Sequence, residues 1–482
     1  MAELAARLPT RPPPVATRTV LVSLAAATLG ALAFGMAVML NGLDVSVWLA
    51  ALGGLVLIAF TLLAVRRYDT AVVIGLLGMG FVRYQPAPTD AAFAVIMVVA
   101  GATGRFRLAR VPLIVRWLVG LLLIVNVLSF IDVVELKEAF QFFFITAYLL
   151  VFSVWFAGYL DSRARARTVT IIWLGVGVVS AVLAISALYL PIPFRSLILS
   201  EVDGGERAAA FFKDPNVFGP FLVPIAVILL EQQISPRIPR LLKLRPLTFW
   251  LLLATLTLGV LFSYSRAAWG NYAIAVGVML IALSIRKRGA QRAMKAMIVL
   301  LATGAVAAVA LSATGSISFL EHRAQLQNYD TQRFAAQDFG WNLGWTHPIG
   351  IGPGQFRFHY PVESHSTFIR TFSEQGFPGL LLWIAILLVT LVIALNNVRQ
   401  GRDTYGIGSA ALLGAWCGLI FNSAVVDTLH WRHLWLVAAL IWASRARTPS
   451  VTPREPRVAA IRPPRDPSPP PAVPALSGSP PL

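Results

Sequence analysis

The sequence predicts an all-α polytopic membrane protein with 12–14 transmembrane helices. The first observation is composition: of 482 residues, 57% are hydrophobic and 13% are charged, and the mean hydropathy is +0.72. These values are far too apolar for a soluble domain. The second is a series of apolar runs of about 17 to 25 residues, close to the roughly 20 that a helix needs to cross the hydrocarbon core. The third is one long polar interval, residues 312–374, which we expect to form a single large loop.

The apolar runs define the predicted spans. The first run is too long for the core of a signal peptide and has no good small-residue cleavage site, so we interpret it as a retained span. Runs 70–83 and 89–104 are short and contain glycines, so they form either two crossings or a re-entrant pair. The predicted spans are 19–40, 45–65, 70–83, 89–104, 111–130, 138–160, 168–190, 214–231, 246–262, 268–285, 295–311, 376–396, 405–423 and 430–444.

The charge distribution predicts which side each loop occupies. The net charge is +18. The gaps between predicted spans lie alternately on the two sides of the membrane. The side that holds both termini carries 29 Lys/Arg and 7 Asp/Glu, and the opposite side carries 11 Lys/Arg and 15 Asp/Glu. This asymmetry is the positive-inside pattern. The excess of positive charge is therefore explained by membrane topology and by attraction to anionic lipid, rather than by binding of nucleic acid. We expect both termini on the cytoplasmic side: a segment at 1–18, and a Pro/Arg-rich tail at 445–482 that is disordered. The transmembrane domain is 19–444, and loop 312–374 faces outward.

The predicted large loop holds four of the six histidines, at positions 322, 347, 359 and 365. His365 has the strongest case for chemistry, because it lies just before a span and a histidine titrates near working pH. The alternative is an interfacial histidine bonded to a backbone carbonyl. The four histidines lack regular ligand spacing, so we expect no metal and no cofactor. The segment Gly350–Gly354 lacks the lysine of a phosphate loop and is interpreted as turns.

Arginines on the outer side are the second set of candidates. Arg207 and Arg266 lie in outer gaps, where arginine is the rarer case. Arg266 has no acid within its own turn, so it needs a lipid headgroup, an acid from another loop or an anionic substrate. A guanidinium that snorkels to lipid phosphate is one interpretation, and a diphosphate-binding arginine is the other. Lys213, Arg333 and Arg370 are secondary candidates for the same role.

Three segments on the predicted outer face carry distinctive motifs. They are Arg207–Gly219; Ser263–Ala268; and, in the loop, Arg333, Thr346–Phe356, Ser364–Ser366 and Glu374–Gly379. Together these segments resemble the O-antigen ligase and O-antigen polymerase superfamily of bacterial membrane glycosyltransferases. The resemblance covers roughly residues 169–441. His365 is followed by Ser366, where the family usually has asparagine, so the chain departs from the family pattern at this position.

The resemblance implies a multi-helix fold of the GT-C kind in the bacterial inner membrane, with 312–374 as a periplasmic loop. It implies an undecaprenyl-diphosphate-linked glycan as donor and a saccharide or lipid-linked saccharide as acceptor. By motif match, Arg207 and Arg266 are its diphosphate-binding arginines and His365 is its catalytic histidine. We expect metal-independent, inverting transfer, with Arg207, Arg266 and His365 converging on one outer-face cavity.

Two other function classes fit the same pattern of spans. A secondary transporter of a small solute or lipid-linked glycan is also a helical bundle, but it tends to place ionisable residues at the midplane, whereas here they gather at the outer surface. A non-catalytic membrane scaffold is the third reading. Ligase and polymerase share the donor motifs, so the sequence leaves the acceptor, the sugar, the linkage and the oligomeric state open.

Overall fold

The computed structural model describes residues 47–83, 87–202, 205–235, 240–284 and 328–444, with a few isolated positions between 291 and 325. The predicted segments 1–18 and 19–40 and the tail 445–482 lie outside the described residues. So do the predicted span 295–311 and the beginning of the loop, 312–327, apart from those isolated positions.

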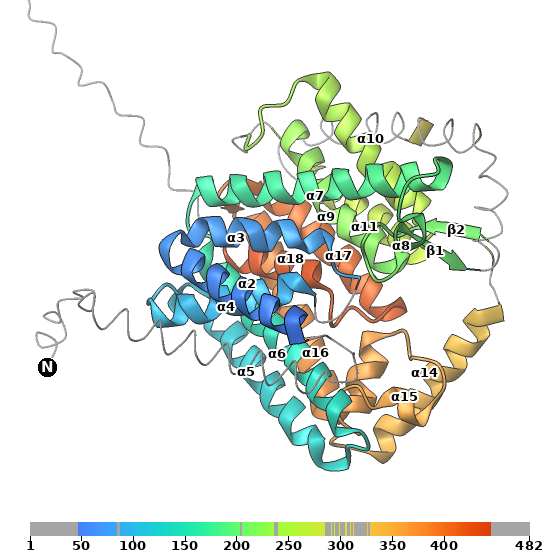
Figure 1. Cartoon of the computed structure of the whole chain (residues 1–482). Coiled ribbons are helices and arrows are strands. Elements are labelled where there is room, and N and C mark those ends of the chain that lie inside the picture. The colour runs from blue at the N-terminus through green and yellow to red at the C-terminus, as the bar shows by residue number, and fades with distance from the viewer. Residues whose placement is uncertain are drawn as a thin grey trace, which may run out of the picture. The chain divides into compact units, whose positions relative to one another are not determined.

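Every predicted span that falls on described residues is helical, which confirms the all-α fold class (Figure 1). Predicted and observed ends differ by a few residues for most helices. The largest difference is at the last long helix, which begins nine residues earlier than predicted. The helices are α2 (Val47–Arg66), α3 (Tyr68–Leu77), α4 (Pro88–Ala102), α5 (Leu113–Leu128), α6 (Leu136–Tyr159), α7 (Arg163–Tyr189), α9 (Pro215–Ile234), α10 (Pro246–Phe262), α11 (Arg266–Ser284), α16 (Thr367–Arg399), α17 (Ser409–Val425) and α18 (Arg432–Trp442).

Six described helices are long and apolar enough to cross a membrane, as expected of a polytopic membrane protein. Helices α3 and α4 have 10 and 15 residues. At 1.5 Å per residue they are about 15 and 22 Å long, which is shorter than the roughly 30 Å of hydrocarbon. The six long helices are Leu113–Asp132, Leu136–Tyr159, Arg163–Tyr189, Pro215–Ile234, Arg266–Ser284 and Thr367–Arg399.

Helix α9 forms the centre of the bundle and is apolar around its whole circumference, as a buried helix must be. Its first turn lies very close to the start of α11. A Cβ atom added at Gly219 would lie 2.6 Å from Ala268 Cβ and 2.7 Å from Ser263 Oγ. Small residues allow helix backbones to approach in this way. The contact places the Asp214–Asn216 segment beside the turn that carries Arg266.

Helices α11 and α17 also pack closely through small residues. A Cβ at Gly414 would lie 2.1 Å from the Ala275 carbonyl oxygen. The buried amides of Asn271 and Asn422 hydrogen-bond to each other, and Asn422 also donates to the Ala267 carbonyl. This contact fixes the end of α17 against the start of α11.

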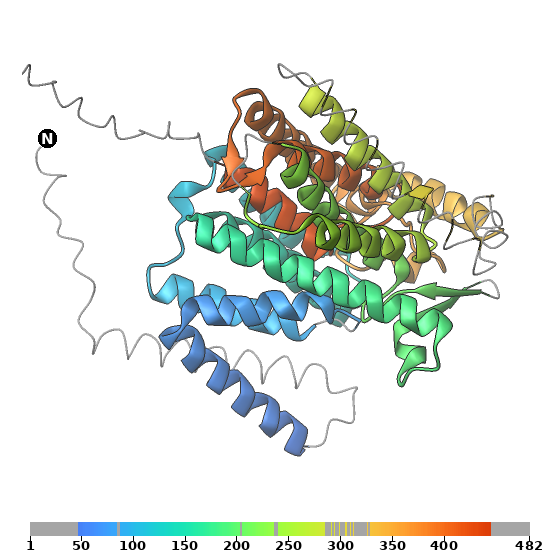
Figure 2. The same ribbon diagram turned by 90° about the horizontal axis from the view of Figure 1, so that it is seen from above.

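The two ends of the bundle differ in character. The α2–α3 turn and the start of α7 lie at one end, on the left in Figure 1, and α8 (Arg195–Ile198), β1 (Leu199–Val202) and β2 (Gly205–Ala208) lie at the other. Figure 2 shows α3 running beside α7, which joins the two ends. Strands β1 and β2 form an antiparallel hairpin. The sequence did not predict it. A second two-residue pair, β3 (Asp403–Thr404) and β4 (Ile407–Gly408), precedes α17.

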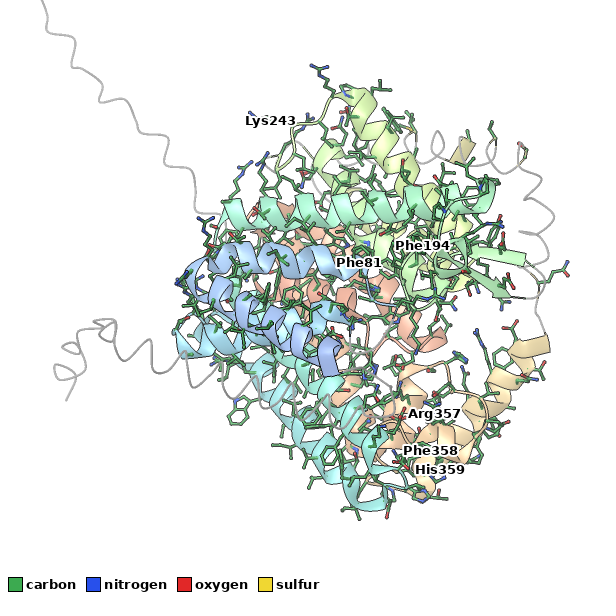
Figure 3. All side chains as sticks on the ribbon, viewed as in Figure 1. Phe81, Phe194, Lys243, Arg357, Phe358 and His359 are labelled. Atoms are coloured by element: carbon green, nitrogen blue, oxygen red, sulfur yellow. The ribbon has the colours of Figure 1, made fainter. Side chains whose placement is uncertain are left out.

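The described part of the large loop is mostly helical. It contains α14 (Asn328–Thr346) and α15 (Phe356–His359), and the labelled residues of α15 lie beside α14 in Figure 3. Helix α14 packs on the first part of α16, because Gly340 and Gly344 leave room for Ile369 and Phe372.

Helix α16 is kinked at Gly376, whose φ of +67° is non-helical. The kink lies at the residue where the span was predicted to start. It leaves carbonyls unpaired within the helix, and the glycine-rich turns occupy them: Ile351 N donates to Ser373 O (3.0 Å) and Gly352 N to Glu374 O (2.9 Å). The segment Gly350–Gly354 is therefore a set of turns, as predicted, that closes the kink.

Candidate active site

Four of the predicted site residues line one cavity of about 620 Å³: Arg207, Arg266, Arg333 and His365. We name it the arginine cavity. Its walls come from β1, β2, the start of α9, the start of α11, α14, the loop before α16 and the end of α17. The remaining lining residues are Ser200, Asp214, Pro215, Asn216, Ala267, Asp330, Gln332, Phe334, Gln337, Val362, Phe421, Ala424, Val425 and Val426.

Arg207 is positioned by the hairpin and is only 4% exposed. Its Nε atom donates to the Ser263 carbonyl at 3.0 Å, and its Nη2 atom donates to Asn216 Oδ1 at 3.3 Å. The Ser265 hydroxyl donates to the same Asn216 oxygen at 2.7 Å. Asn216 therefore ties Arg207 to the turn that precedes Arg266, so the two arginine motifs form one hydrogen-bonded unit.

Arg266 is held by an acid from another segment. Its Nη2 atom lies 2.6 Å and 2.8 Å from the two carboxylate oxygens of Asp330 at the start of α14, and its Nη1 atom donates to the Gln325 carbonyl at 3.1 Å. Of the three partners that the sequence left open, the structure contains the acid from another loop. Asp330 is buried, whereas the Arg266 side chain is 28% exposed, so the pair is shielded from water on the side of the acid.

His365 stands in a tight turn with φ of +48° and is partly buried. Burial, together with the smaller effect of the positive charge on Arg333, lowers the pKa of its imidazole to about 4, although Asp214 and Asp427 act in the opposite direction. The imidazole is therefore neutral at neutral pH and has a lone pair that can accept a proton.

Each of the three motifs contains a non-glycine residue with positive φ: Ala210 (+49°), Tyr264 (+47°) and His365 (+48°). Among the described residues only Phe194 and Tyr405 share this property. Left-handed backbone is unfavourable for residues with a side chain and is concentrated at functional sites. The strained turns mark the same three segments as the motifs.

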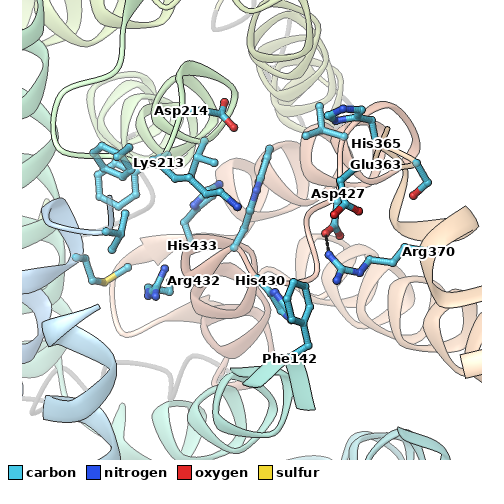
Figure 4. A pocket seen from close by; sticks show the side chains of 18 residues that line it. Phe142, Lys213, Asp214, Glu363, His365, Arg370, Asp427, His430, Arg432 and His433 are labelled. Atoms are coloured by element: carbon cyan, nitrogen blue, oxygen red, sulfur yellow. Dashed lines mark hydrogen bonds and ion pairs between the residues drawn. The ribbon is translucent and has the colours of Figure 1, made fainter. Parts of the chain in front are cut away.

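A smaller cavity of about 170 Å³ adjoins the arginine cavity, and His365, Asp214 and Val426 line both. Figure 4 shows it. Lys213 and Arg370 line this smaller cavity rather than the arginine cavity. His365 is thus the predicted residue that faces both spaces.

Arg370 is 6% exposed and is held between two carboxylates. Its Nε atom donates to Glu374 at 3.1 Å, and its Nη1 atom forms a short contact with Asp427. Its guanidinium also lies 4.5 Å from the centre of the Phe142 ring. Burial alone would raise the pKa of Asp427. The positive charge of the Arg370 guanidinium and weaker favourable contacts together outweigh burial, so this pKa lies below its usual value. This arrangement fixes α16 to the loop before α18.

Sequence reasoning missed several residues of the site. Asp330, Asn216 and Asp427 were not singled out as site residues. His430 is also buried here, with its Nε2 atom 2.9 Å from Thr146 Oγ1, and burial lowers its pKa to about 3. The available signal was the short gap 425–429 between two apolar runs, which has the same form as the gap that carries Arg266.

The other loop histidines lie elsewhere. His347 Nδ1 is 3.0 Å from the Thr346 hydroxyl at the end of α14. His359 is exposed on α15, and partial burial together with His347 lowers its pKa. His322 lies outside the described residues. In the part of the chain that the structure describes, no group of three His, Cys, Asp or Glu side chains is placed to hold a metal ion.

Comparison with known proteins identifies the region that carries these motifs. Residues 251–384 match the family model described as O-Antigen ligase. The matched region contains Arg266, Arg333, His365 and Arg370, and it excludes Arg207. No curated protein matches the chain. The match supports membership in the O-antigen ligase superfamily and indicates an O-antigen ligase-like enzyme.

Proposed function

We propose that this O-antigen ligase-like enzyme moves a glycan from an undecaprenyl-diphosphate carrier to an acceptor sugar hydroxyl at the periplasmic face of the inner membrane. One observation carries the proposal: three arginines and one neutral histidine, from four separate segments, line a single cavity. The arginine side chains are suited to bind a diphosphate, and the neutral histidine is suited to accept a proton. No described group is suited to a metal ion.

The diphosphate is assigned to Arg207 and Arg266, with Arg333 as a third cation. Guanidinium groups bind phosphate oxygens through paired N–H donors. Negative charge builds up on the leaving diphosphate as its bond to the sugar breaks. Fixed donors aimed at such charge contribute about 3 kcal/mol each to lowering the barrier. Arg207 is fixed by Ser263 and Asn216, so it needs little rearrangement to act.

His365 is assigned as the general base. The acceptor oxygen attacks the anomeric carbon and forms the new glycosidic bond, while the bond from that carbon to the diphosphate oxygen breaks. The acceptor proton passes to the His365 imidazole, and the bonding electrons leave with the diphosphate. Direct displacement inverts the configuration of the sugar carbon. A positioned base contributes about 10²- to 10⁴-fold to such a step.

The low pKa of His365 fits this assignment only in the presence of the donor. A base with pKa of about 4 is weak. A bound diphosphate brings negative charge into the cavity, which favours the protonated imidazole and raises its pKa. The donor therefore strengthens the base that will act on the acceptor.

The secondary candidates receive different roles. Lys213 lines the smaller cavity next to His365, where it can add positive charge for the leaving group. Arg370 is occupied by Glu374 and Asp427, so we assign it to positioning the start of α16 rather than to the diphosphate.

The membrane placement is part of the same proposal. It rests on the positive-inside pattern, with both termini cytoplasmic and the region 312–374 periplasmic. In this proposal, the segment 1–18 and the tail 445–482 lie on the cytoplasmic side. Both ligase and polymerase acceptors fit, since the groups assigned here contact the donor and the acceptor hydroxyl alone.

Transfer can be tested with purified full-length protein, a radiolabelled lipid-linked oligosaccharide and a saccharide acceptor, with and without a chelator. We expect transfer that the chelator does not reduce, and a loss of at least 100-fold in His365→Ala. His359→Ala removes an exposed histidine of the same loop and should retain full activity. Wild-type turnover in a folded His365→Ala protein would exclude the base assignment. Solute flux without any transfer would favour the transporter reading.

A further inference from the structure

A third cavity lies at the opposite end of the bundle from the arginine cavity, at the α2–α3 turn and the start of α7 (Figure 1). Its volume is about 510 Å³. We name it the basic pocket. It is formed where α2 ends, α3 begins, α6 ends and α7 begins, together with the loop after α4. Its lining residues are Arg66, Arg67, Tyr68, Asp69, Thr70, Arg105, Arg107, Gly158, Tyr159 and Arg165.

Two buried tyrosines form a rigid wall of the basic pocket. Tyr68 and Tyr159 are 7% and 5% exposed, and their rings meet edge to face with centroids 6.1 Å apart. The Tyr68 hydroxyl accepts a hydrogen bond from Trp155 Nε1 at 2.8 Å. The Tyr159 hydroxyl donates to Asp69 at 2.9 Å. These bonds hold both rings in place, so the pocket has a built wall rather than a set of loose surface chains.

Two arginines lie over the faces of these rings. The Arg105 guanidinium is 4.9 Å from the Tyr68 centroid, and the Arg165 guanidinium is 4.4 Å from the Tyr159 centroid. Stacking on an aromatic face fixes a guanidinium while leaving the N–H groups at its edge able to donate. Arg105 and Arg165 are thus held in place within the pocket wall.

The pocket carries an excess of positive charge. Arg165 pairs with Asp69 and Asp161, and Arg107 pairs with Asp161. For the other three arginines, no carboxylate of the described residues lies within ion-pair distance; these are Arg66, Arg67 and Arg105. Three neighbouring positive charges favour the binding of an anion from outside the described part of the chain.

The surface that leads to the pocket is apolar. Helix α2, which ends at Arg66, exposes Leu55 (65%) and Leu62 (50%) along its length. An exposed apolar face on a helix of a membrane protein lies against acyl chains. A ligand that has both a phosphate and acyl chains can therefore fill the pocket and contact this face at once, whereas a soluble phosphate can use only the pocket.

We propose that the basic pocket binds the phosphodiester group of an anionic phospholipid in the cytoplasmic leaflet. Basic pockets between helices on that side of a membrane are suited to such headgroups. A soluble phosphate and a phospholipid present the same phosphate group to the pocket. The exposed apolar face of α2 favours the phospholipid, because only the lipid has acyl chains that can contact this face. This site is separate from the arginine cavity and does not depend on glycosyl transfer.

The proposal can be tested with the full-length protein in a nonionic detergent. Native mass spectrometry and thermal unfolding would be followed while adding short-chain phosphatidylglycerol, short-chain phosphatidylcholine or inorganic phosphate. We expect phosphatidylglycerol to bind and to raise the apparent Tm, and the other two to do neither at equal concentration. Arg67→Gln/Arg105→Gln should weaken phosphatidylglycerol binding by about tenfold or more.

A matched control removes the same charge outside the pocket. Lys243→Gln/Arg245→Gln alters two exposed cations of the loop before α10, and it should leave phosphatidylglycerol binding unchanged. Equal weakening in both double variants would overturn the pocket, because the effect would then follow net charge. Binding of inorganic phosphate that is lost only in Arg67→Gln/Arg105→Gln would overturn the lipid as the source. Equal binding of phosphatidylcholine would overturn recognition of the anionic headgroup.

Discussion

The guanidinium of Arg266 binds both carboxylate oxygens of Asp330, with Nη2 2.6 Å from Oδ1 and 2.8 Å from Oδ2. The acid has two effects on a donor diphosphate. It orients the arginine, and it places a negative charge in the same cavity. A substitution at Asp330 therefore distinguishes its effect on the orientation of Arg266 from the effect of its negative charge on the donor.

We predict that Asp330→Asn lowers both KM for the donor and kcat, each by about threefold to tenfold. KM falls because one repelling charge is removed from the cavity. The value of kcat falls because Arg266 is less well aligned in the transition state. Steady-state kinetics in micelles would measure both. Arg266→Ala should instead raise KM and lower kcat, so an Asp330→Asn variant that behaves like Arg266→Ala would contradict the charge effect.

The low pKa of His365 predicts that the stability of the ligand-free protein depends on pH. The imidazole has a pKa of about 4 in the folded protein and about 6.5 when unfolded, so between these values the unfolded state binds more protons. The contribution of His365 is complete above pH 6.5 and is lost as the pH falls toward 4. The apparent Tm should fall over this range. His365→Asn, chosen because asparagine tolerates positive φ, should reduce the slope. An unchanged slope would show that His365 is not the group responsible.

The donor should shift the pH dependence of the reaction. The acid limb of kcat/KM reports the free enzyme, and that of kcat reports the donor complex. Because bound diphosphate raises the pKa of His365, the limb of kcat should lie at higher pH than the limb of kcat/KM. Rates measured from pH 3.5 to 8 on one donor would show this. Limbs that coincide would mean that the diphosphate does not approach the imidazole.

Arg370 is predicted to matter for stability more than for donor binding. Arg370→Met leaves the buried carboxylates of Glu374 and Asp427 without their cation, which costs about 3 kcal/mol or more. The apparent Tm in detergent should fall markedly. In Arg370→Met/Glu374→Gln/Asp427→Asn the charges are removed together, so much of the Tm should return. If the triple variant were as unstable as the single one, the ion pairs would not be the cause.

The kink of α16 gives a prediction with a built-in control. Gly376 and Gly401 have nearly equal φ values, +67° and +64°. A Cβ at Gly376 would lie 2.1 Å from the Pro348 carbonyl oxygen, and a Cβ at Gly401 has no atom within 4 Å. Gly401→Ala should cost about 1–2 kcal/mol from backbone strain alone. Gly376→Ala should lower the apparent Tm further and abolish transfer, because it displaces the turns that support Glu374. Equal effects of the two variants would contradict a specific role for the kink.

Local patterns in the sequence predicted most of the fold. Apolar runs of sufficient length located every described span, because crossing hydrocarbon demands a nearly fixed number of apolar residues. The helix α16 began at Thr367 rather than at 376. Its first two turns are polar, so hydropathy counted them with the loop. The β1–β2 hairpin was missed for a similar reason, since two four-residue strands leave little pattern to detect.

Sequence motifs named only part of the candidate site. His365, Arg207 and Arg266 stood out because outer-side arginine and loop histidine are unusual. Their partners did not, because Asp330 and Asn216 are ordinary residues 64 and 9 positions along the chain from the groups they bind. Pairing over such separations depends on how α9, α11 and α14 pack, and no local pattern encodes it.

The left-handed turns at Ala210, Tyr264 and His365 have a practical consequence. A conformation that is unfavourable for the residue persists only while its surroundings impose it. The packing of β2, α9, α11, α14 and α17 around the arginine cavity imposes it here. A change that loosens this packing therefore lets the turns relax while the helices remain intact. Far-UV circular dichroism would then report full helix content in a sample whose site has lost its shape, so helicity does not measure the catalytic competence of this chain.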